Sequence, residues 1–136
     1  MRVTLTRTHG AQYLGHNEAG RELQLSGSPD IGPSEAGVRP MEAVLFGLAG
    51  CTAVDVQLIL QKGRHSLEHL SVTVDAARAD AVPAVFTTIH LHFEAAGDFP
   101  LAKLERAVQL SHEKYCSVAH MLEPDVVITT SCALRA

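Results

Sequence analysis

Cysteine is scarce in this chain, and its spacing is unlike that of a small protein held together by disulfides. The 136 residues contain three cysteines, Cys51, Cys116 and Cys132. An odd number at wide spacing fits neither a secreted disulfide framework nor the paired CxxC ligands of a zinc site. In a reducing compartment, such thiols either pack as small apolar side chains or take part in redox chemistry.

Basic clusters and export signals are also lacking. Lysine and arginine are scattered and the formal net charge is −4, so the chain has no electrostatic surface for nucleic acid. The opening MRVTLTRTHG contains no apolar signal-peptide core, and Asp55 and Gln57 interrupt the longest apolar run. We therefore expect a cytoplasmic protein with no nucleic-acid and no membrane partner.

The composition is that of a folded globular protein. Apolar residues make up 46% and charged residues 19% of the chain. A chain of 136 residues can bury a sizeable core without disulfides or metals. We expect a single domain over residues 1–136.

The first half of the sequence predicts three short strands followed by a long helix. Apolar and polar residues nearly alternate in RVTLTRT, QYLGHNE and RELQLSG, which is typical of an antiparallel meander. A Gly-, Ser- and Pro-rich loop over 26–40 leads to a helix over 41–62, which has no internal proline and is followed by Gly63. Apolar side chains surround this helix, so we expect its own sheet and a second subunit to cover it.

The second half predicts two long strands, a helix pair and a final strand. The strand-like segments are 67–79 and 85–95, with a hairpin connection between them. Helical spacing follows over 101–116 and in a short turn over 117–123, and a β-branched run closes the chain over 125–135. The order predicts an α+β fold, with antiparallel sheets wrapped around a long apolar central helix.

Two motifs give a more specific indication. PMEAVLFGLAGC and DVQLILQKGR lie on the long helix, and KYCSVAHML follows the amphipathic helix. With these motifs the chain resembles the OsmC/Ohr family of thiol-dependent hydroperoxide reductases, in particular its OsmC-like subgroup with a PMELLL-type helix start. The resemblance implies an OsmC/Ohr-like fold and an intertwined homodimer with active sites at the subunit interface.

The resemblance also implies a two-cysteine peroxidase cycle. The thiolate of Cys51 would attack a hydroperoxide and become a sulfenic acid, and Cys116 would convert it to a Cys51–Cys116 disulfide. An external dithiol, lipoyl-type or similar, would reduce the disulfide, and no cofactor would be needed. The apolar surroundings of the helix favour organic hydroperoxides as the small substrate. The alternative is a binding or redox-sensing protein for a small hydrophobic ligand, with little turnover.

Activation of Cys51 requires a cation, because this residue lies near the middle of the helix and far from its positive end. The family places an Arg and a Glu beside the reactive thiol, and Arg39 and Glu42 are the candidates by position. Arg21 is the alternative cation. Glu42 stands nine residues before Cys51, whereas the better-known peroxidase branches have the Glu ten residues before, where this chain has Met41. In a regular helix Glu42 and Cys51 face opposite sides. Glu42 therefore either reaches a site across the dimer interface or is a first-turn acid that complements the helix dipole.

Asp55 follows Cys51 by four residues and shares its helix face, where a like charge disfavours the thiolate. Asp55 could take part in the chemistry with a cation between the two groups, or it could accept a bond from a buried donor on a neighbouring strand or subunit. Cys116 stands at the expected start of the short helix, where backbone N–H groups favour a thiolate. Local physics thus favours Cys116 as the nucleophile and the resemblance favours Cys51, while Cys132 is expected to have a packing role.

Eight histidines raise the question of a metal. Some are spaced to share a face, but none forms a full ligand set, so we expect no metal site. His112 or His120 could instead tune the protonation of the second thiol. The pairs with shared spacing are His90 with His92, His65 with His69, and His112 with Cys116.

Overall fold

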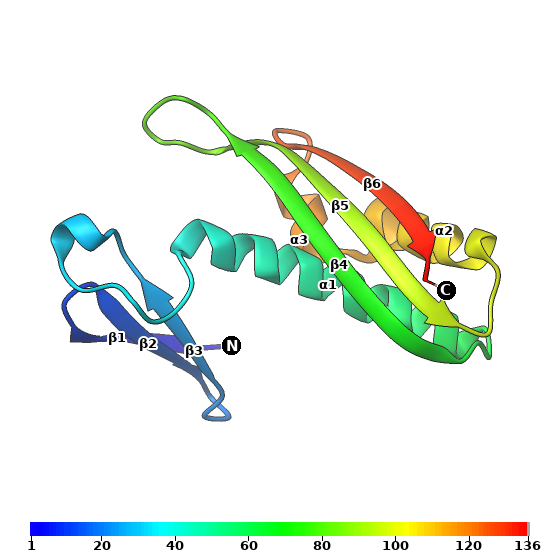
Figure 1. Cartoon of the computed structure of the whole chain (residues 1–136), viewed down its shortest axis with the longest axis horizontal. Helices are drawn as coiled ribbons and strands as arrows, with labels where there is room; N and C mark the ends of the chain where they lie inside the picture. The colour runs from blue at the N-terminus through cyan, green and yellow to red at the C-terminus, as the bar shows by residue number, and fades with distance from the viewer. Residues whose placement is uncertain (136) are drawn as a thin grey trace. The chain divides into compact units, whose positions relative to one another are not determined.

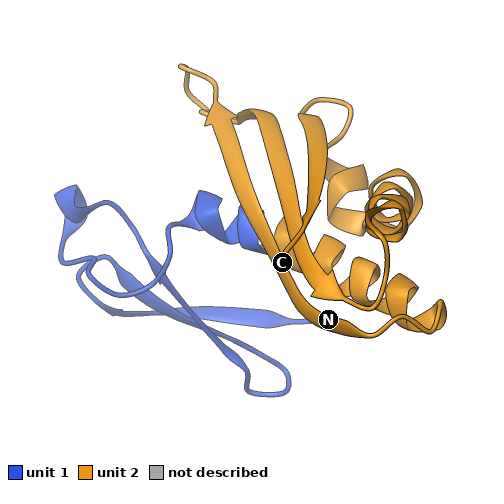
Figure 2. Ribbon diagram, turned by 45° about the vertical axis from the view of Figure 1, so that its right-hand side comes forward, with its two compact units in different colours: residues 1–46 blue, residues 47–136 orange. Residues whose placement is uncertain are grey.

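The computed structural model describes residues 1–135, and its elements follow one another in the order drawn in Figure 1. The chain divides into two compact units, residues 1–46 and residues 47–136, coloured separately in Figure 2. The division falls within the long helix α1 (Pro40–Lys62). A single domain over residues 1–136 stays a prediction.

Unit 1 is built on a three-stranded antiparallel sheet in the order β1-β2-β3, as the alternating pattern predicts. The turn between the first two strands requires glycine. Gly10 has a φ of +56°, and a Cβ at this position would lie 2.6 Å from the Pro33 ring. A short 3₁₀ turn, η1 (Pro29–Ile31), interrupts the following loop. The strands are β1 (Val3–His9), β2 (Gln12–Asn17) and β3 (Glu22–Ser26).

Helix α1 begins and ends with recognisable caps. Pro40 occupies its first position, where the missing N–H costs nothing, and the carboxylate of Glu42 accepts a bond from the backbone N–H of Arg39 at 2.9 Å. The predicted end at Lys62 is confirmed. The left-handed residue is Arg64 (φ 61°) rather than Gly63, and the N–H groups of Arg64 and His65 donate to the carbonyls of Gln61 and Leu60 in a Schellman arrangement.

One stripe of α1 is buried, and the rest of its apolar surface is not. The buried positions recur every four residues: Leu48, Thr52, Val56 and Leu60. Large apolar side chains on other faces remain exposed, with Phe46 and Val54 each 63% and Leu58 49% exposed. By length and composition α1 could also span a membrane, a property it shares with core helices of soluble proteins. Asp55 and Gln57 therefore do not exclude α1 as a membrane-spanning helix. The absence of a membrane partner stays a prediction.

Unit 2 contains a mixed sheet in the order β4-β5-β6. Strand β4 (Leu67–Arg78) pairs antiparallel with β5 (Phe86–Gly97), as predicted. Strand β6 (Val127–Leu134) pairs parallel with β5, so the prediction of purely antiparallel sheets is wrong at this edge. The reason is that two helices separate β5 from β6 and return the chain to the end of the sheet where β5 begins. The α+β fold itself, with two small sheets and a long helix, is confirmed.

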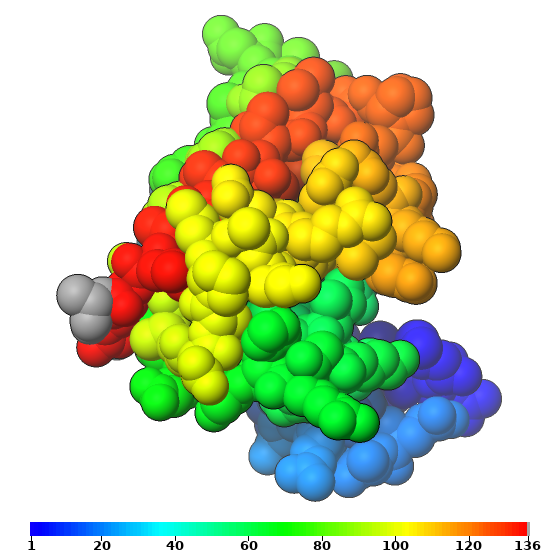
Figure 3. Space-filling view, turned by 90° about the vertical axis from the view of Figure 1, so that its right-hand side faces the viewer, coloured from blue at the N-terminus to red at the C-terminus, as the bar shows by residue number. Residues whose placement is uncertain are grey.

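Helices cover one face of this second sheet (Figure 2). The predicted helix over 101–116 is divided: α2 (Leu101–Leu110) gives way to a π turn, η2 (Ser111–Tyr115), before the short α3 (Ser117–Leu122). Figure 3 shows α2 in yellow beside β6 in red and the following turn in orange. Inward side chains of β5 and α2 form the core, namely Ile89, Leu91, Phe93, Leu104 and Val108. The π turn ends at Cys116, one of the two cysteines in the motifs.

Candidate active site

The fold of unit 2 brings two cysteines that are far apart in the sequence into one cluster. Cys51 lies on α1, and Cys116 is the N-cap residue of α3. The Sγ atoms of both residues and a carboxylate oxygen of Asp55 all lie within 4.8 Å of one another. We call these three residues the thiol–carboxylate cluster. All three cysteines of the chain are free thiols.

Local backbone structure fixes each member of the cluster. Cys51 and Asp55 are four residues apart on α1 and therefore share a face. Cys116 ends the π turn, because its N–H donates to the carbonyl of Ser111, five residues back, at 2.7 Å. Its Sγ then accepts a bond from the N–H of Ala119 at 3.4 Å. The π turn thus directs the second sulfur towards α1.

The two thiols differ in their access to solvent. Cys51 is half-buried, whereas Cys116 is fully buried. Burial raises the pKa of the Cys116 thiol from 9.0 to about 11, the N–H of Ala119 lowers it by less, and the neighbouring Cys51 raises it further. The expectation that the start of α3 favours a thiolate at Cys116 is therefore wrong in its net direction, because desolvation outweighs the N–H groups.

Asp55 has a donor from another element, as one of the two alternatives predicts. The buried hydroxyl of Ser111 donates to Asp55 Oδ2 at 2.8 Å. The donor comes from the π turn rather than from a strand or a second subunit. This bond uses one of the acceptor positions of the carboxylate and leaves Asp55 Oδ1 available.

A cavity of about 440 Å³ opens beside the cluster and shares Asp55 with it. Its walls are largely apolar, with one amine and one phenol among them. An apolar wall next to a polar reactive group is the usual arrangement of a small-molecule site. The other lining residues are Leu58, Ile59, Lys62, Leu110 and Tyr115.

The three remaining candidates from the sequence belong to unit 1. The contact between Arg39 and Glu42 is a backbone-to-carboxylate bond that caps α1, in keeping with a first-turn role for the acid. Arg21 precedes β3, and its backbone N–H donates to the side chain of Asn17 at 2.9 Å. Whether any of the three serves the thiols stays a prediction.

The histidines nearest the second thiol contact other groups. His112 Nε2 lies 2.6 Å from Glu123 Oε1. The two ring nitrogens of His120 lie 2.9 Å from the carbonyl oxygen of Cys116 and 3.1 Å from that of Glu113. These contacts hold the loop around Cys116 and do not reach its sulfur.

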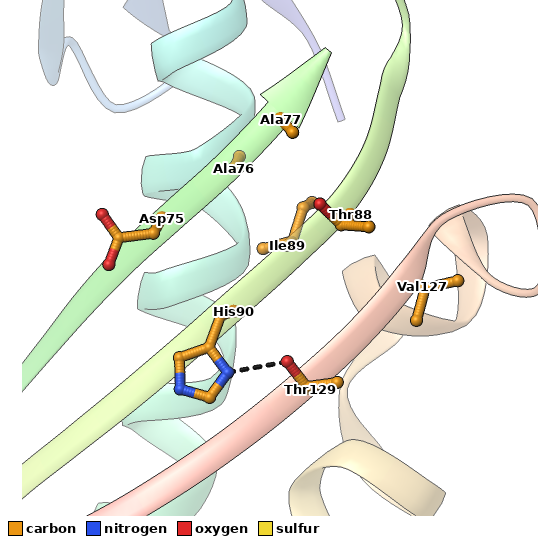
Figure 4. A pocket seen from close by; sticks show the side chains of 8 residues that line it. All are labelled: Asp75, Ala76, Ala77, Thr88, Ile89, His90, Val127 and Thr129. Atoms are coloured by element: carbon orange, nitrogen blue, oxygen red, sulfur yellow. Dashed lines mark hydrogen bonds between the residues drawn. The ribbon is translucent and has the colours of Figure 1, made fainter. Parts of the chain in front are cut away.

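His90 and His92 share the outer face of the second sheet, as their spacing predicts. His90 Nδ1 lies 2.6 Å from Thr129 Oγ1, and His92 Nδ1 lies 2.6 Å from Ser131 Oγ. Figure 4 shows His90 pointing towards Thr129 over a shallow pocket of this face. Inward neighbours such as Leu91 are buried under the helices, so this pocket lies on the opposite face from the thiols.

The fold and the cluster define the class of protein: a small α+β protein in which one thiol on a long helix lies next to a second thiol at the start of a short helix. A family model described as "OsmC-like protein" matches residues 32–131. The chain belongs to the OsmC-like family, and the resemblance inferred from the two motifs is confirmed.

Comparison with individual proteins gives the same result. The chain is 43% identical over 133 residues to Protein YhfA of Escherichia coli (strain K12), covering 96% of each protein. It is similar to a solved structure from Aquifex aeolicus VF5, with 30% identity, coverage of 98% and 95% of the two chains, and a TM-score of 0.85. The chain shares the fold of an organic hydroperoxide resistance protein from Elizabethkingia anophelis, with 13% identity and a TM-score of 0.73. The match covers 99% of this chain and 97% of that protein.

Proposed function

We propose that the protein is a thiol-dependent peroxidase for organic hydroperoxides, with Cys51 as the nucleophile and Cys116 as the resolving thiol. The observation that carries the proposal is the proximity of the two sulfurs, one half-exposed and one buried. Family membership supports it, as does the name of the Elizabethkingia protein with the same fold.

Access to peroxide supports this division of roles between the two thiols. A peroxide must reach the attacking sulfur, and only Cys51 of the pair has exposed surface. The Cys51 thiolate attacks the outer peroxide oxygen, the O–O bond breaks, and the alkoxide leaves and takes up a proton as the alcohol. The product at Cys51 is a sulfenic acid.

Cys116 then completes the oxidation. Its sulfur displaces hydroxide from the Cys51 sulfenic acid, and the proton of the thiol leaves with that hydroxide as water. A dithiol of the lipoyl type then reduces the disulfide by two thiol–disulfide exchanges, which give back the two protein thiols and leave the dithiol oxidised to its own disulfide. Burial suits Cys116 for this step, because a shielded thiol is not oxidised before its partner.

The cavity beside Asp55 supports an organic substrate. Leu58, Ile59 and Leu110 offer an alkyl group an apolar surface next to the cluster. The guanidinium of Arg39, with Arg21 as the alternative, would stabilise the Cys51 thiolate, and Glu42 would orient it. Unlike those of the two thiols, these roles rest on the family pattern.

A homodimer is part of the proposal. Large apolar side chains are exposed on the strands of unit 1, including Val3 at 76% and Leu5 at 53%, and on α1. Surfaces of this kind usually mark an interface. Sedimentation equilibrium should give twice the chain mass of 14.6 kDa, and a monomer mass at micromolar concentration would contradict the dimer.

Peroxide consumption tests the activity directly. Reduced protein is mixed with cumene hydroperoxide and dihydrolipoamide, and peroxide loss is followed for the wild type, Cys51→Ser and Cys116→Ser, with Cys132→Ser as the matched control. We expect Cys51→Ser to abolish turnover, Cys116→Ser to stop after one equivalent, and Cys132→Ser to behave as the wild type. Wild-type turnover no faster than buffer would overturn the proposal.

The same cavity supports a second candidate, a binding or redox-sensing protein for a small hydrophobic ligand. In that case one equivalent of peroxide would form the Cys51–Cys116 disulfide without sustained turnover. Peptide mapping identifies which cysteines form the disulfide. A disulfide that includes Cys132 would contradict both candidates.

A further inference from the structure

We propose that the reduced thiol–carboxylate cluster is a binding site for a thiophilic divalent cation of the Zn²⁺ type. Two sulfur atoms and one carboxylate oxygen converge from Cys51, Cys116 and Asp55, all within 4.8 Å of one another. This inference uses the residues of the proposed peroxidase but does not require peroxide turnover.

The geometry is close to that of a tetrahedral site. With Zn–S distances of about 2.3 Å and Zn–O distances of about 2.1 Å, tetrahedral ligand atoms stand about 3.5 to 3.8 Å apart. Because its ligand atoms lie within 4.8 Å of one another, the cluster needs a contraction of about 1.3 Å at most, which side-chain rotation on α1 can supply.

A supporting contact orients the carboxylate. The Ser111 hydroxyl donates to Asp55 Oδ2 at 2.8 Å, and this serine is fully buried. Ligating carboxylates in metalloproteins are characteristically held by such hydrogen bonds. The N–H of Ala119, 3.4 Å from Cys116 Sγ, would offset part of the charge of a metal-bound thiolate.

The donor set selects the type of cation. Two thiolates favour zinc and other soft cations over Mg²⁺ or Ca²⁺, which take oxygen ligands. Three protein ligands leave one tetrahedral position for water, on the side where Cys51 and Asp55 are partly exposed. Binding replaces the two thiol protons, so Zn²⁺ and the neutral thiols give a dithiolate complex and two released protons.

Metal binding and disulfide formation exclude one another. The disulfide removes both sulfur ligands, and the bound cation occupies the lone pairs that would attack peroxide. Zinc would therefore inhibit a peroxidase at this site and protect its thiols from oxidation.

The test uses Co²⁺ as a spectroscopic probe, added anaerobically to the fully reduced, metal-free full chain. We expect one Co²⁺ per chain, with sulfur-to-cobalt charge-transfer absorption, tetrahedral d–d bands, and complete displacement by Zn²⁺. Release of about two protons below the thiol pKa should accompany binding.

Variants locate the ligands. Cys51→Ser and Cys116→Ser should each remove the charge-transfer band, and Ser111→Ala should weaken Zn²⁺ binding by roughly 10- to 100-fold. Asp55→Asn should weaken it at least tenfold, and Cys132→Ser should leave it unchanged. Far-ultraviolet circular dichroism of each variant separates a lost ligand from a lost fold.

The proposal is overturned if Co²⁺ gives only octahedral bands without sulfur charge transfer, or if a folded Cys116→Ser variant binds as tightly as the wild type. Its failure can be told apart from failure of the proposed function. The cobalt titration needs no peroxide, and the peroxide assay is run with chelator present.

Discussion

Raising the pH should destabilise the folded protein through one buried thiol, Cys116. Burial raises the pKa of this thiol from 9.0 to about 11. Between these two values the unfolded chain has lost the proton that the folded chain keeps. Because the folded state then binds more protons, the free energy of unfolding falls as the pH rises through this window. Below pH 9.0 both states are protonated, and the thiol contributes no pH dependence.

The size of the effect follows from the width of the window. A difference of about two pH units at about 1.4 kcal/mol per unit gives a loss of about 3 kcal/mol across the window. This is a large part of the stability of an ordinary domain of this size. The Cys51→Ser variant should keep most of this loss in the free energy of unfolding, because burial, and not the neighbouring thiol, is the leading cause of the raised pKa of Cys116.

Urea unfolding of the reduced protein measures this prediction, at one protein concentration and with chelator present, in steps from about pH 8 to about pH 11. The matched variant is Cys116→Ala, which is less stable throughout but lacks the thiol. Other groups titrate in this range in both proteins, so the difference between the two curves is the measured quantity. Parallel curves between pH 9 and 11 would refute the assignment of the raised pKa to the buried Cys116.

Substitutions at three further positions test the fold and the role of the first-turn acid. Arg64→Gly should stabilise the protein by about 1 kcal/mol in urea unfolding, because Arg64 is left-handed (φ 61°); no gain would contradict the cap geometry. Phe93→Ala should cost about 3 to 5 kcal/mol in the same assay, because this side chain is fully buried, and a cost below about 1 kcal/mol would place Phe93 outside the core. Glu42→Ala should cost about 1 kcal/mol, whereas Glu42→Gln keeps the cap; a folded Glu42→Gln that loses peroxide turnover would show that the acid also serves the chemistry.

Much of the fold can be predicted from the sequence, because its signals are local. Alternation in the three opening strands and the proline-free run after Pro40 each specify an element within its own residues. The direction of β6 cannot be predicted in this way, because it depends on the path of the chain through α2, η2 and α3. The two helices between β5 and β6 form a crossover connection, which allows the two strands to run parallel.

The site was predictable in its residues more than in its arrangement. The motifs single out Cys51 and Cys116, but regular helical spacing would place His112 on the face of Cys116, four residues away. The π turn breaks that spacing: Cys116 Sγ lies in the cluster with Cys51, and His112 contacts Glu123 instead. No residue pattern in SHEKY announces a π turn, so the contact between Ser111 and Asp55 could not be foreseen.

Burial, rather than the helix terminus, sets the direction of the pKa shift at Cys116. Local reasoning favours Cys116 because N–H groups at the start of α3 can stabilise a thiolate, and the N–H groups of Ala119 and Val118 both lower the pKa of this thiol. Yet α3 has only six residues, and Cys116, whose sulfur caps this helix, is fully buried. These N–H groups do not compensate for the loss of water around a charged sulfur, so the pKa of Cys116 rises. The raised pKa keeps the buried thiol neutral near pH 7, which would protect it from direct oxidation in the resolving role proposed for it.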